Sequence, residues 1–167
     1  MKFLLKLEHW QLFLIVFTPV FINFFSSYNS TLNTISMIFF TIGTLGWVWA
    51  ISTSLNDKLP LDSKLNIKVF RILFLIPIIY ILLLTLGLDY ILNEGDGNGG
   101  LFGVIIILHL FSMFCIFYGL RFAAKTMKSV ELGRNAKFGD YAGEFFLMWF
   151  SFIGYWVLQP RLNKLIK

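Results

Sequence analysis

Two histidines and one cysteine are the side chains of this sequence best suited to metal or covalent chemistry. They are His9, His109 and Cys115, in a chain of 167 residues. A zinc site of the Cys/His type needs three or four ligands at characteristic spacings, and these three do not supply them. No G-x-S-x-G motif and no phosphate-binding glycine loop occurs either. The sequence therefore predicts no metal, no cofactor and no enzymatic activity.

His109 is a candidate binding residue because it is the only His, Asp, Glu, Lys or Arg well inside a long apolar stretch. Ionisable side chains inside membrane spans are costly, and functional roles are their usual explanation. The alternative is a neutral imidazole that forms a hydrogen bond with Ser112, Thr41 or Thr44 within a helix bundle. Both interpretations stay open.

The densest group of charged side chains follows the last long apolar stretch. The candidate binding residues in this group are Arg121, Lys125, Lys128, Arg134, Asp140 and Glu144, with Arg161 further along the chain. If a helix continues to about Leu132, its first three bases share one face and could hold an anionic lipid, a phosphorylated ligand or an acidic partner. The simpler interpretation is general attraction to anionic headgroups, about 1 kcal/mol per base.

Ion pairs are expected among these charges. Glu131 and Arg134 have the i,i+3 spacing at which helical side chains meet. Asp140, Glu144 and Arg161 flank a strongly aromatic segment, and we expect them to form structural salt bridges there.

The run Glu94-Gly-Asp-Gly-Asn-Gly99 has oxygen-bearing side chains at alternate positions, as the first half of a calcium loop does. Position twelve of such a loop must be a bidentate Glu, and Ile105 stands there instead. The glycines favour a turn between two antiparallel helices.

Four long apolar stretches must position these side chains. They cover about residues 11–26, 33–54, 69–88 and 101–124 of a chain that is 57% apolar and 14% charged. About 20 apolar residues in a helix cross the hydrocarbon core of a bilayer. The predicted fold is all-α: one integral membrane domain over residues 1–167, built as a four-helix bundle with no room for a soluble catalytic domain.

The charges predict the orientation of these spans. All 14 Lys and Arg residues lie near the N-terminus, around the connection between the second and third stretches, or from the end of the fourth onward. The connection after the third stretch carries only acids, namely Asp89, Glu94 and Asp96. The positive-inside rule then places both termini in the cytoplasm, and a bacterial cytoplasmic membrane is the expected location. Contact with anionic headgroups explains the net charge of +5 more simply than nucleic-acid binding does.

A fifth apolar segment, residues 145–158, is short for a span and has bases on both sides. We expect a single amphipathic helix over about 140–159, lying in the cytoplasmic interface, with Asp140 as its N-cap and Pro160 as its end. The alternative is a short fifth span.

The first and third stretches each contain a proline, Pro19 and Pro77, and the second and fourth each carry a stripe of small residues. The stripes are Gly43, Gly46, Ala50 and Ser54, and Ser112, Cys115, Gly119 and Ala123. Small residues let helices approach closely in a membrane. A repeat of two hairpins with a transport site at the interrupted helices is one interpretation. The favoured interpretation is that the prolines are ordinary helix kinks and the small residues ordinary packing faces.

Three C-terminal pieces, KSVELGR, FGDYAGEFF and WVLQPRLNK, resemble the tail of small uncharacterised bacterial integral membrane proteins with four spans. The resemblance covers about a quarter of the chain, from Lys125 to Lys164. It implies a multi-pass membrane fold and no particular activity.

The expected function is that of a non-enzymatic accessory or scaffold subunit that binds partner proteins, a second copy of itself or anionic lipids. The alternative is a small transporter or oligomeric channel with a site near Pro19, Pro77 and His109. A lipid-modifying enzyme comes third, since only Asp140 and Glu144 resemble the clustered acids such enzymes use near an interface.

Overall fold

The computed structural model describes residues 2–25, 30–60, 63–94 and 99–166, which form helices joined by short connections, with no strand among them. The helices are η1 (Lys2–Leu5), α1 (His9–Phe25), α2 (Ser30–Asn56), α3 (Ile67–Glu94), α4 (Gly99–Leu132), α5 (Phe138–Trp149) and α6 (Ser151–Ile166). The predicted all-α fold is confirmed. The calcium-like run falls largely on residues 95–98, outside the described ranges.

In the described part of the chain, three helices are long and apolar enough to cross a membrane, as a multi-pass membrane protein requires. The segments are Thr31–Asn56, Ile67–Gly87 and Gly103–Leu132. The helix that corresponds to the first predicted span, α1, has only 17 residues. At 1.5 Å per residue it is about 25 Å long. A fourth span therefore stays a prediction.

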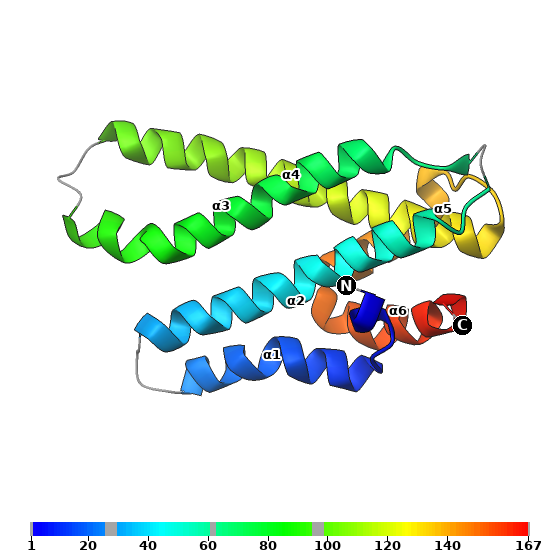
Figure 1. Ribbon diagram of the computed structural model, residues 1–167, viewed down its shortest axis with the longest axis horizontal. Coiled ribbons are helices and arrows are strands. Elements are labelled where there is room, and N and C mark those ends of the chain that lie inside the picture. Colours follow the sequence, from blue (N-terminus) through cyan, green and yellow to red (C-terminus); the bar gives the residue numbers. More distant parts are fainter. Residues whose placement is uncertain (1, 26–29, 61–62, 95–98, 167) are drawn as a thin grey trace.

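The first four helices form two hairpins, α1–α2 and α3–α4, that meet along α2. This helix contacts α1, α3, α4, α6 and η1, so it is the centre of the molecule. Toward the connections at residues 26–29 and 95–98 the two hairpins separate, and the molecule has the outline of a fork (Figure 1). The helix pair α5–α6 lies at the other end, where the hairpins are joined.

Two glycines set the spacing inside these hairpins. A Cβ atom at Gly43 of α2 would lie 2.5 Å from a methyl carbon of Val16, and one at Gly119 of α4 would lie 2.1 Å from the ring of Phe74. Neither distance is possible without movement, so both positions require the absence of a side chain. The small residues beside them, Gly46, Ala50, Ser112, Cys115 and Ala123, are buried as well.

The expectation of one continuous helix over 140–159 is wrong. α5 ends at Trp149, Phe150 has a non-helical backbone (φ −88°, ψ 60°), and α6 begins at Ser151. The turn requires Gly154, because a Cβ there would lie 2.0 Å from the carbonyl oxygen of Leu147. The two helices pack on each other, so residues 145–158 form neither a single interfacial helix nor a single short span.

The expected ends of that helix are also wrong. The N-cap of α5 is Lys137, and Asp140 occupies the third helical position, where its carboxylate accepts the N–H of Lys137 at 2.9 Å. Pro160 lies inside α6, which continues to Ile166. A proline inside a helix removes one backbone hydrogen bond. The buried face of α6 on both sides of it (Leu158, Gln159 and Leu162) holds the helix in place.

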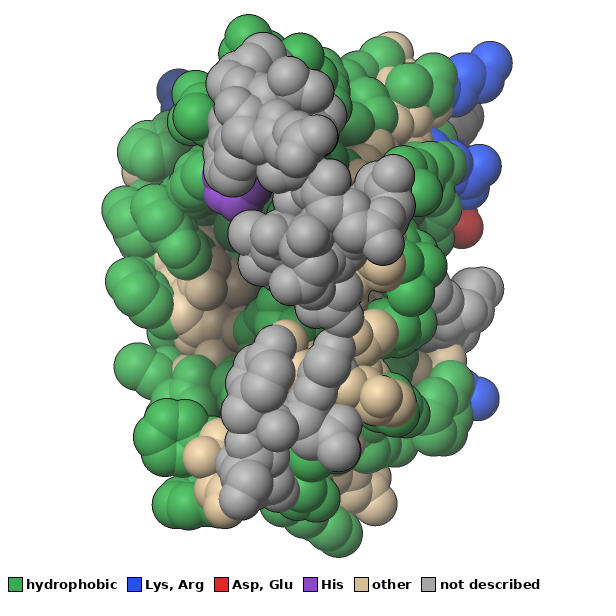
Figure 2. All heavy atoms as spheres, turned by 90° about the vertical axis from the view of Figure 1, so that its left-hand side faces the viewer, with side chains coloured by type: hydrophobic (Ala, Val, Ile, Leu, Met, Phe, Trp, Pro, Cys, Tyr) green, Lys and Arg blue, Asp and Glu red, His purple; other side chains and the backbone are tan. Residues whose placement is uncertain are grey.

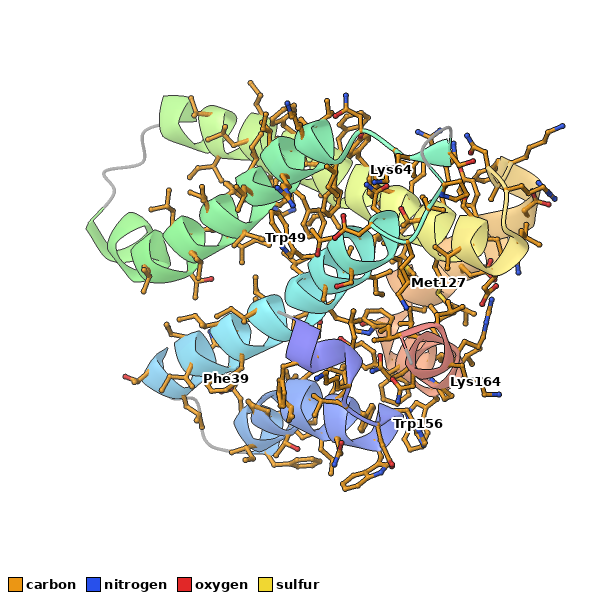
Figure 3. The ribbon with its side chains drawn as sticks, turned by 45° about the vertical axis from the view of Figure 1, so that its right-hand side comes forward. Phe39, Trp49, Lys64, Met127, Trp156 and Lys164 are labelled. Carbon is orange, nitrogen blue, oxygen red and sulfur yellow. The ribbon has the colours of Figure 1, made fainter. Side chains whose placement is uncertain are left out.

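The basic residues gather at the joined end of the fork. This end, called the basic end below, comprises the start of α1, the α2–α3 connection, the α4–α5 connection and the last turns of α6. Figure 3 brings it forward and shows Lys64 and Lys164 on it. The opposite end is covered mostly by hydrophobic side chains where it is described (Figure 2).

A buried glutamine ties the N-terminal segment to this end. The Gln159 amide nitrogen donates to the carbonyl oxygens of Leu4 at 3.1 Å and Leu7 at 2.8 Å, and its oxygen accepts the indole N–H of Trp47 at 2.7 Å. Trp47 and Gln159 are both fully buried. Trp47 is thus a core residue. Exposure of Trp10, Trp149 and Trp156 is close to one half.

Candidate functional site

Four charged side chains from three helices form one cluster at the basic end. This charge cluster consists of Lys128 and Glu131 of α4, Glu144 of α5 and Arg161 of α6. The Arg161 guanidinium donates to both carboxylate oxygens of Glu131, at 2.9 and 2.7 Å, and to Glu144 at 2.7 Å. The Lys128 ammonium lies 3.2 Å from each carboxylate. Two cations and two carboxylates balance, so the cluster is neutral.

The expected pairing of Glu131 with Arg134 is wrong, because the helix does not continue to Arg134. α4 ends at Leu132, and Gly133 takes a left-handed conformation with φ +63°. Arg134 therefore leaves the helical register and pairs with Asp140 through two hydrogen bonds of 3.0 and 3.3 Å. The Ser129 hydroxyl closes the same turn by accepting the N–H of Ala136 at 2.9 Å.

These contacts shift the pKa of two carboxyl groups. Burial alone raises the pKa of Glu144, but the hydrogen bonds from Arg161 and Lys128 outweigh it and hold this pKa below its ordinary value of 4.5. For Asp140, the hydrogen bonds from Arg134 and from the backbone of Lys137 lower the pKa. Both groups are thus held as carboxylates at neutral pH.

Two bases of α4 lie outside this cluster. Arg121 donates its Nε–H to the hydroxyl oxygen of Tyr141 at 3.1 Å, and Lys125 lies one turn further along the helix. Together with Leu65 and Asn66, which precede α3, and Tyr118 and Phe122 of α4, they line a cavity of about 140 Å³. No carboxylate of the described chain pairs with either base. The common face expected for Arg121, Lys125 and Lys128 therefore divides into paired and unpaired cations.

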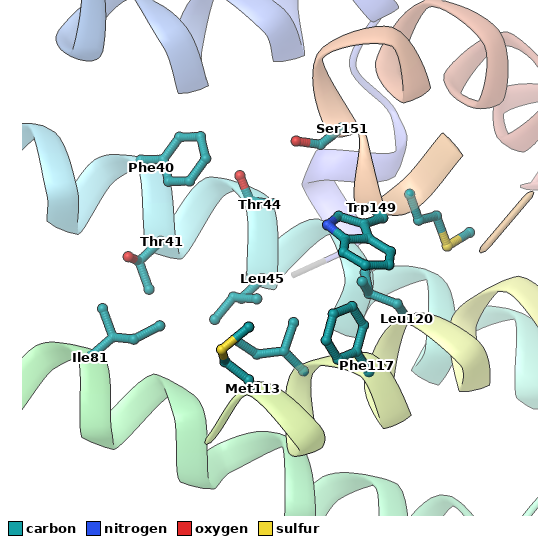
Figure 4. A pocket seen from close by; sticks show the side chains of 12 residues that line it. Phe40, Thr41, Thr44, Leu45, Ile81, Met113, Phe117, Leu120, Trp149 and Ser151 are labelled. Atoms are coloured by element: carbon teal, nitrogen blue, oxygen red, sulfur yellow. The ribbon is translucent and has the colours of Figure 1, made fainter. Parts of the chain in front are cut away.

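A larger cavity, of about 270 Å³, lies where the two hairpins separate (Figure 4). Its lining comes from five helices: Phe40, Thr41, Thr44 and Leu45 of α2, Ile81 of α3, Met113, Ile116, Phe117 and Leu120 of α4, Met148 and Trp149 of α5, and Ser151 of α6. The walls are mostly apolar, and their polar side-chain groups are the hydroxyls of Thr41, Thr44 and Ser151 and the indole N–H of Trp149. The Thr44 hydroxyl accepts a hydrogen bond from Tyr155 at 3.3 Å.

His109 lies on the surface of α4 rather than in the bundle interior. Its Nδ1 is 3.3 Å from the hydroxyl oxygen of Tyr80 on α3, so the partner is neither Ser112 nor the threonines of α2. Pro77 is on the same α3 helix. Pro19 is on α1, across α2 from this hairpin (Figure 1), and its carbonyl oxygen accepts the Ser36 hydroxyl at 2.8 Å. The structure does not bring Pro19 together with His109.

Of the sequence-predicted site residues, Lys128, Glu144 and Arg161 meet in the charge cluster and Arg134 meets Asp140. Sequence reasoning missed Glu131 as a member, although its position one turn after Lys128 on the same helix was a usable signal. Tyr141 was missed as well. Among the described residues, no three His, Cys, Asp or Glu side chains are grouped so that they could hold a metal ion.

Comparison with protein-family models, with curated proteins and with solved structures finds no match for this chain.

Proposed function

We propose that this chain is a non-enzymatic accessory subunit that binds a transmembrane segment of a partner protein between its two hairpins. The observation that carries the proposal is the cavity of about 270 Å³ at the fork, with apolar walls from both hairpins. Lipid-facing helices of one protein gain little from hydrophobicity when they associate, so close packing and interhelical hydrogen bonds decide which helices pair. A recess lined with hydroxyl groups provides both close packing and partners for interhelical hydrogen bonds.

The hydroxyl groups favour a helix over a lipid chain as the occupant. Thr41, Thr44 and Ser151 surround the cavity from α2 and α6 (Figure 4). An acyl chain has no group that could use these donors and acceptors. A partner helix with a Ser, Thr, Asn or Gln side chain has one, and such contacts contribute about 0.6 kcal/mol each in membranes.

The rigid basic end supports the same function. The charge cluster joins α4, α5 and α6, and Gln159 joins α6 to the N-terminal segment and α2. With that end held, the free ends of the hairpins are held apart before a partner arrives. A preorganised site loses less conformational entropy on binding.

The proposed setting is a bacterial cytoplasmic membrane with four spans and both termini in the cytoplasm. The base distribution supports this orientation through the positive-inside rule. The transporter alternative has no observation in its favour beyond the prolines inside α1 and α3, because Pro19 and His109 lie on different hairpins. Solute flux in proteoliposomes that His109→Ala abolishes would favour it over the accessory function.

Site-specific photo-crosslinking tests the proposal. A photoreactive amino acid replaces Met113 in the cavity, and a control replaces Ile107, an exposed residue of α4 outside the cavity. In membranes of the source cell, we expect a protein adduct of defined mass from position 113 and none from position 107. Lipid adducts alone, or the same adducts from both positions, would overturn the proposal. An adduct of twice the chain mass identifies the partner as a second copy.

A further inference from the structure

The cavity at Arg121 and Lys125 has the features of an anion site. Three other bases of the C-terminal region, Lys128, Arg134 and Arg161, pair with carboxylates. Within the described chain, Arg121 and Lys125 do not. Among the described residues, the Tyr141 hydroxyl is the only partner of the Arg121 side chain, and no hydrogen bond or ion pair joins Lys125 to another of these residues. Two unneutralised cations one helical turn apart thus face one recess of about 140 Å³.

The start of α3 adds to the positive potential of this recess. Asn66, which lines it, precedes α3 and accepts the N–H of Val69 at 3.2 Å, as an N-cap does. The N-terminus of a helix carries a partial positive charge. The recess therefore offers two full charges and a helix dipole to an anion, with Tyr118 at its edge.

An apolar groove continues from the same two residues. Tyr118 and Arg121 also line a second recess, of about 220 Å³, together with Phe114, Phe117, Phe138 and Phe145. Phe114 and Arg121 are seven residues apart on α4, which places the aromatic end about 10 Å further along the helix, toward the middle of the candidate span Gly103–Leu132. One ligand would thus meet charge at the basic end and aromatic rings deeper in the membrane.

We propose that these two recesses together bind one anionic phospholipid. Its phosphate lies between Arg121 and Lys125, and one acyl chain lies in the groove of Phe114, Phe117 and Phe145. Charge complementarity selects the head, and the adjoining aromatic groove selects a lipid over a soluble phosphate. The site is separate from the cavity at the fork, so the proposal does not rest on the partner-binding function.

Native mass spectrometry of the purified full-length chain tests the proposal. The probes are phosphatidylglycerol, zwitterionic phosphatidylcholine and soluble glycerol 1-phosphate, each titrated into detergent micelles. We expect one phosphatidylglycerol to be retained per chain, with phosphatidylcholine bound about tenfold more weakly. Equal retention of both lipids, or full displacement of phosphatidylglycerol by glycerol phosphate, would overturn the proposal.

A matched pair of variants separates the site from general surface charge. Arg121→Gln with Lys125→Gln removes two charges in the recess, and Lys6→Gln with Lys164→Gln removes two exposed charges elsewhere at the basic end. We expect the first pair to weaken phosphatidylglycerol retention about tenfold and the second to leave it unchanged. An equal loss in both pairs would show that only general attraction acts.

A groove variant tests the second half of the site. Phe114 is 63% exposed, so Phe114→Ala is expected to leave the fold intact. It should weaken phosphatidylglycerol retention and leave glycerol phosphate binding unaffected; unchanged lipid retention would exclude the groove. If Arg121→Gln lowers the melting temperature, Lys125→Glu serves as the charge variant, since Lys125 makes no hydrogen bond within the described chain.

Discussion

Glu144 joins the last three helices of the chain. Its side chain is 7% exposed and accepts hydrogen bonds from Lys128 of α4 and Arg161 of α6. The pKa of this carboxyl lies below its ordinary value of 4.5 in the folded chain. Such a group contributes stability above the pKa of the unfolded state and loses it as the pH falls through the folded pKa. Acid therefore weakens the contact between α5 and its neighbours.

Glu144→Gln should lower the free energy of unfolding by about 2 kcal/mol at pH 7, because Arg161 and Lys128 each lose a charged partner in a buried site. The difference from the original chain should shrink as the pH falls below the ordinary value of 4.5 and through the lower pKa that Glu144 has in the folded chain. Denaturant titrations in micelles, followed by circular dichroism, measure both effects. Glu8→Gln is the control, because Glu8 is exposed and its replacement should leave the free energy of unfolding unchanged. A constant difference at all pH values would contradict the role of the charge.

The contact between Trp47 and Gln159 should show energetic coupling. Trp47→Phe and Gln159→Met each leave a buried polar group without its partner, at a cost of about 1–3 kcal/mol. Since the two side chains share one hydrogen bond of 2.7 Å, the double variant should cost less than the sum of the two. Trp10→Phe supplies the control, because Trp10 is exposed and donates to Glu8 instead. Additive effects in the Trp47 cycle would show that the bond does not matter.

Sequence reasoning identified most of these charged residues but only part of their pairing. The sequence predicts salt bridges for Asp140, Glu144 and Arg161 beside the aromatic segment without assigning their partners, and Glu144 pairs with Arg161 at 2.7 Å. Arg161 also binds Glu131, which is 30 positions away in the chain. The i,i+3 spacing pairs Glu131 with Arg134 in the sequence. Spacing along one helix gives no information on which residues of α6 pack against α4.

At the scale of elements, the turn between α5 and α6 depends on Gly154. Its N–H donates to the carbonyl of Phe150 at 2.9 Å, and the carbonyl oxygen of Leu147 occupies the space that a Cβ would need. This oxygen is a backbone atom of Leu147, so it cannot rotate out of the way as the tip of a side chain can. A side chain at position 154 must therefore push α6 away from α5.

Gly154→Ala should destabilise the chain by more than about 2 kcal/mol, since overpacking against backbone forces helices to move. Gly143→Ala is the matched control, because a Cβ there meets no atom within 4 Å. It should stabilise α5 by up to about 1 kcal/mol through helix propensity. Thermal unfolding of both variants in micelles gives the comparison. Equal melting temperatures would show that the helix pair tolerates a wider turn.

The three longer predicted spans match the observed helices well, and the C-terminal segment does not. Residues 33–54, 69–88 and 101–124 fall inside α2, α3 and α4, because apolar length is a direct signal of a membrane helix. The break at Phe150 lies within an unbroken apolar run, where periodicity continues and no Pro or Asn-Gly marks a turn. The position of this break depends on tertiary contacts of Gly154 and Trp149, and a local sequence pattern does not reveal such contacts.

At the scale of the whole molecule, contacts between the two ends of the chain support the prediction of four spans. Hydrogen bonds from Gln159 and Asn163 of α6 reach the carbonyl oxygens of Leu4 and Leu7, so the N-terminal and C-terminal segments lie together. If α2, α3 and α4 each cross the membrane and α1 does not, the N-terminal segment lies on one side of the membrane and the C-terminal segment on the other. Crossing by α1 as well brings them to one side, as the bonds require. Helix α1, about 25 Å long, has nearly the length for this.

Thiol labelling of the intact cell tests this parity. In a chain carrying Cys115→Ala, single cysteines replace Lys6, Lys164 or Asn98, and a membrane-impermeant reagent is added from outside. Four spans predict labelling at position 98 alone, with positions 6 and 164 labelled only after the membrane is opened. Labelling of position 6 but not 164 from outside would mean three spans, and the Gln159 bonds to Leu4 and Leu7 could not then form in the membrane. The substitution Gln159→Met in the same background is the control for the Gln159 hydrogen bonds to Leu4 and Leu7. It should change the stability of the chain and leave the labelling pattern of the three positions unchanged.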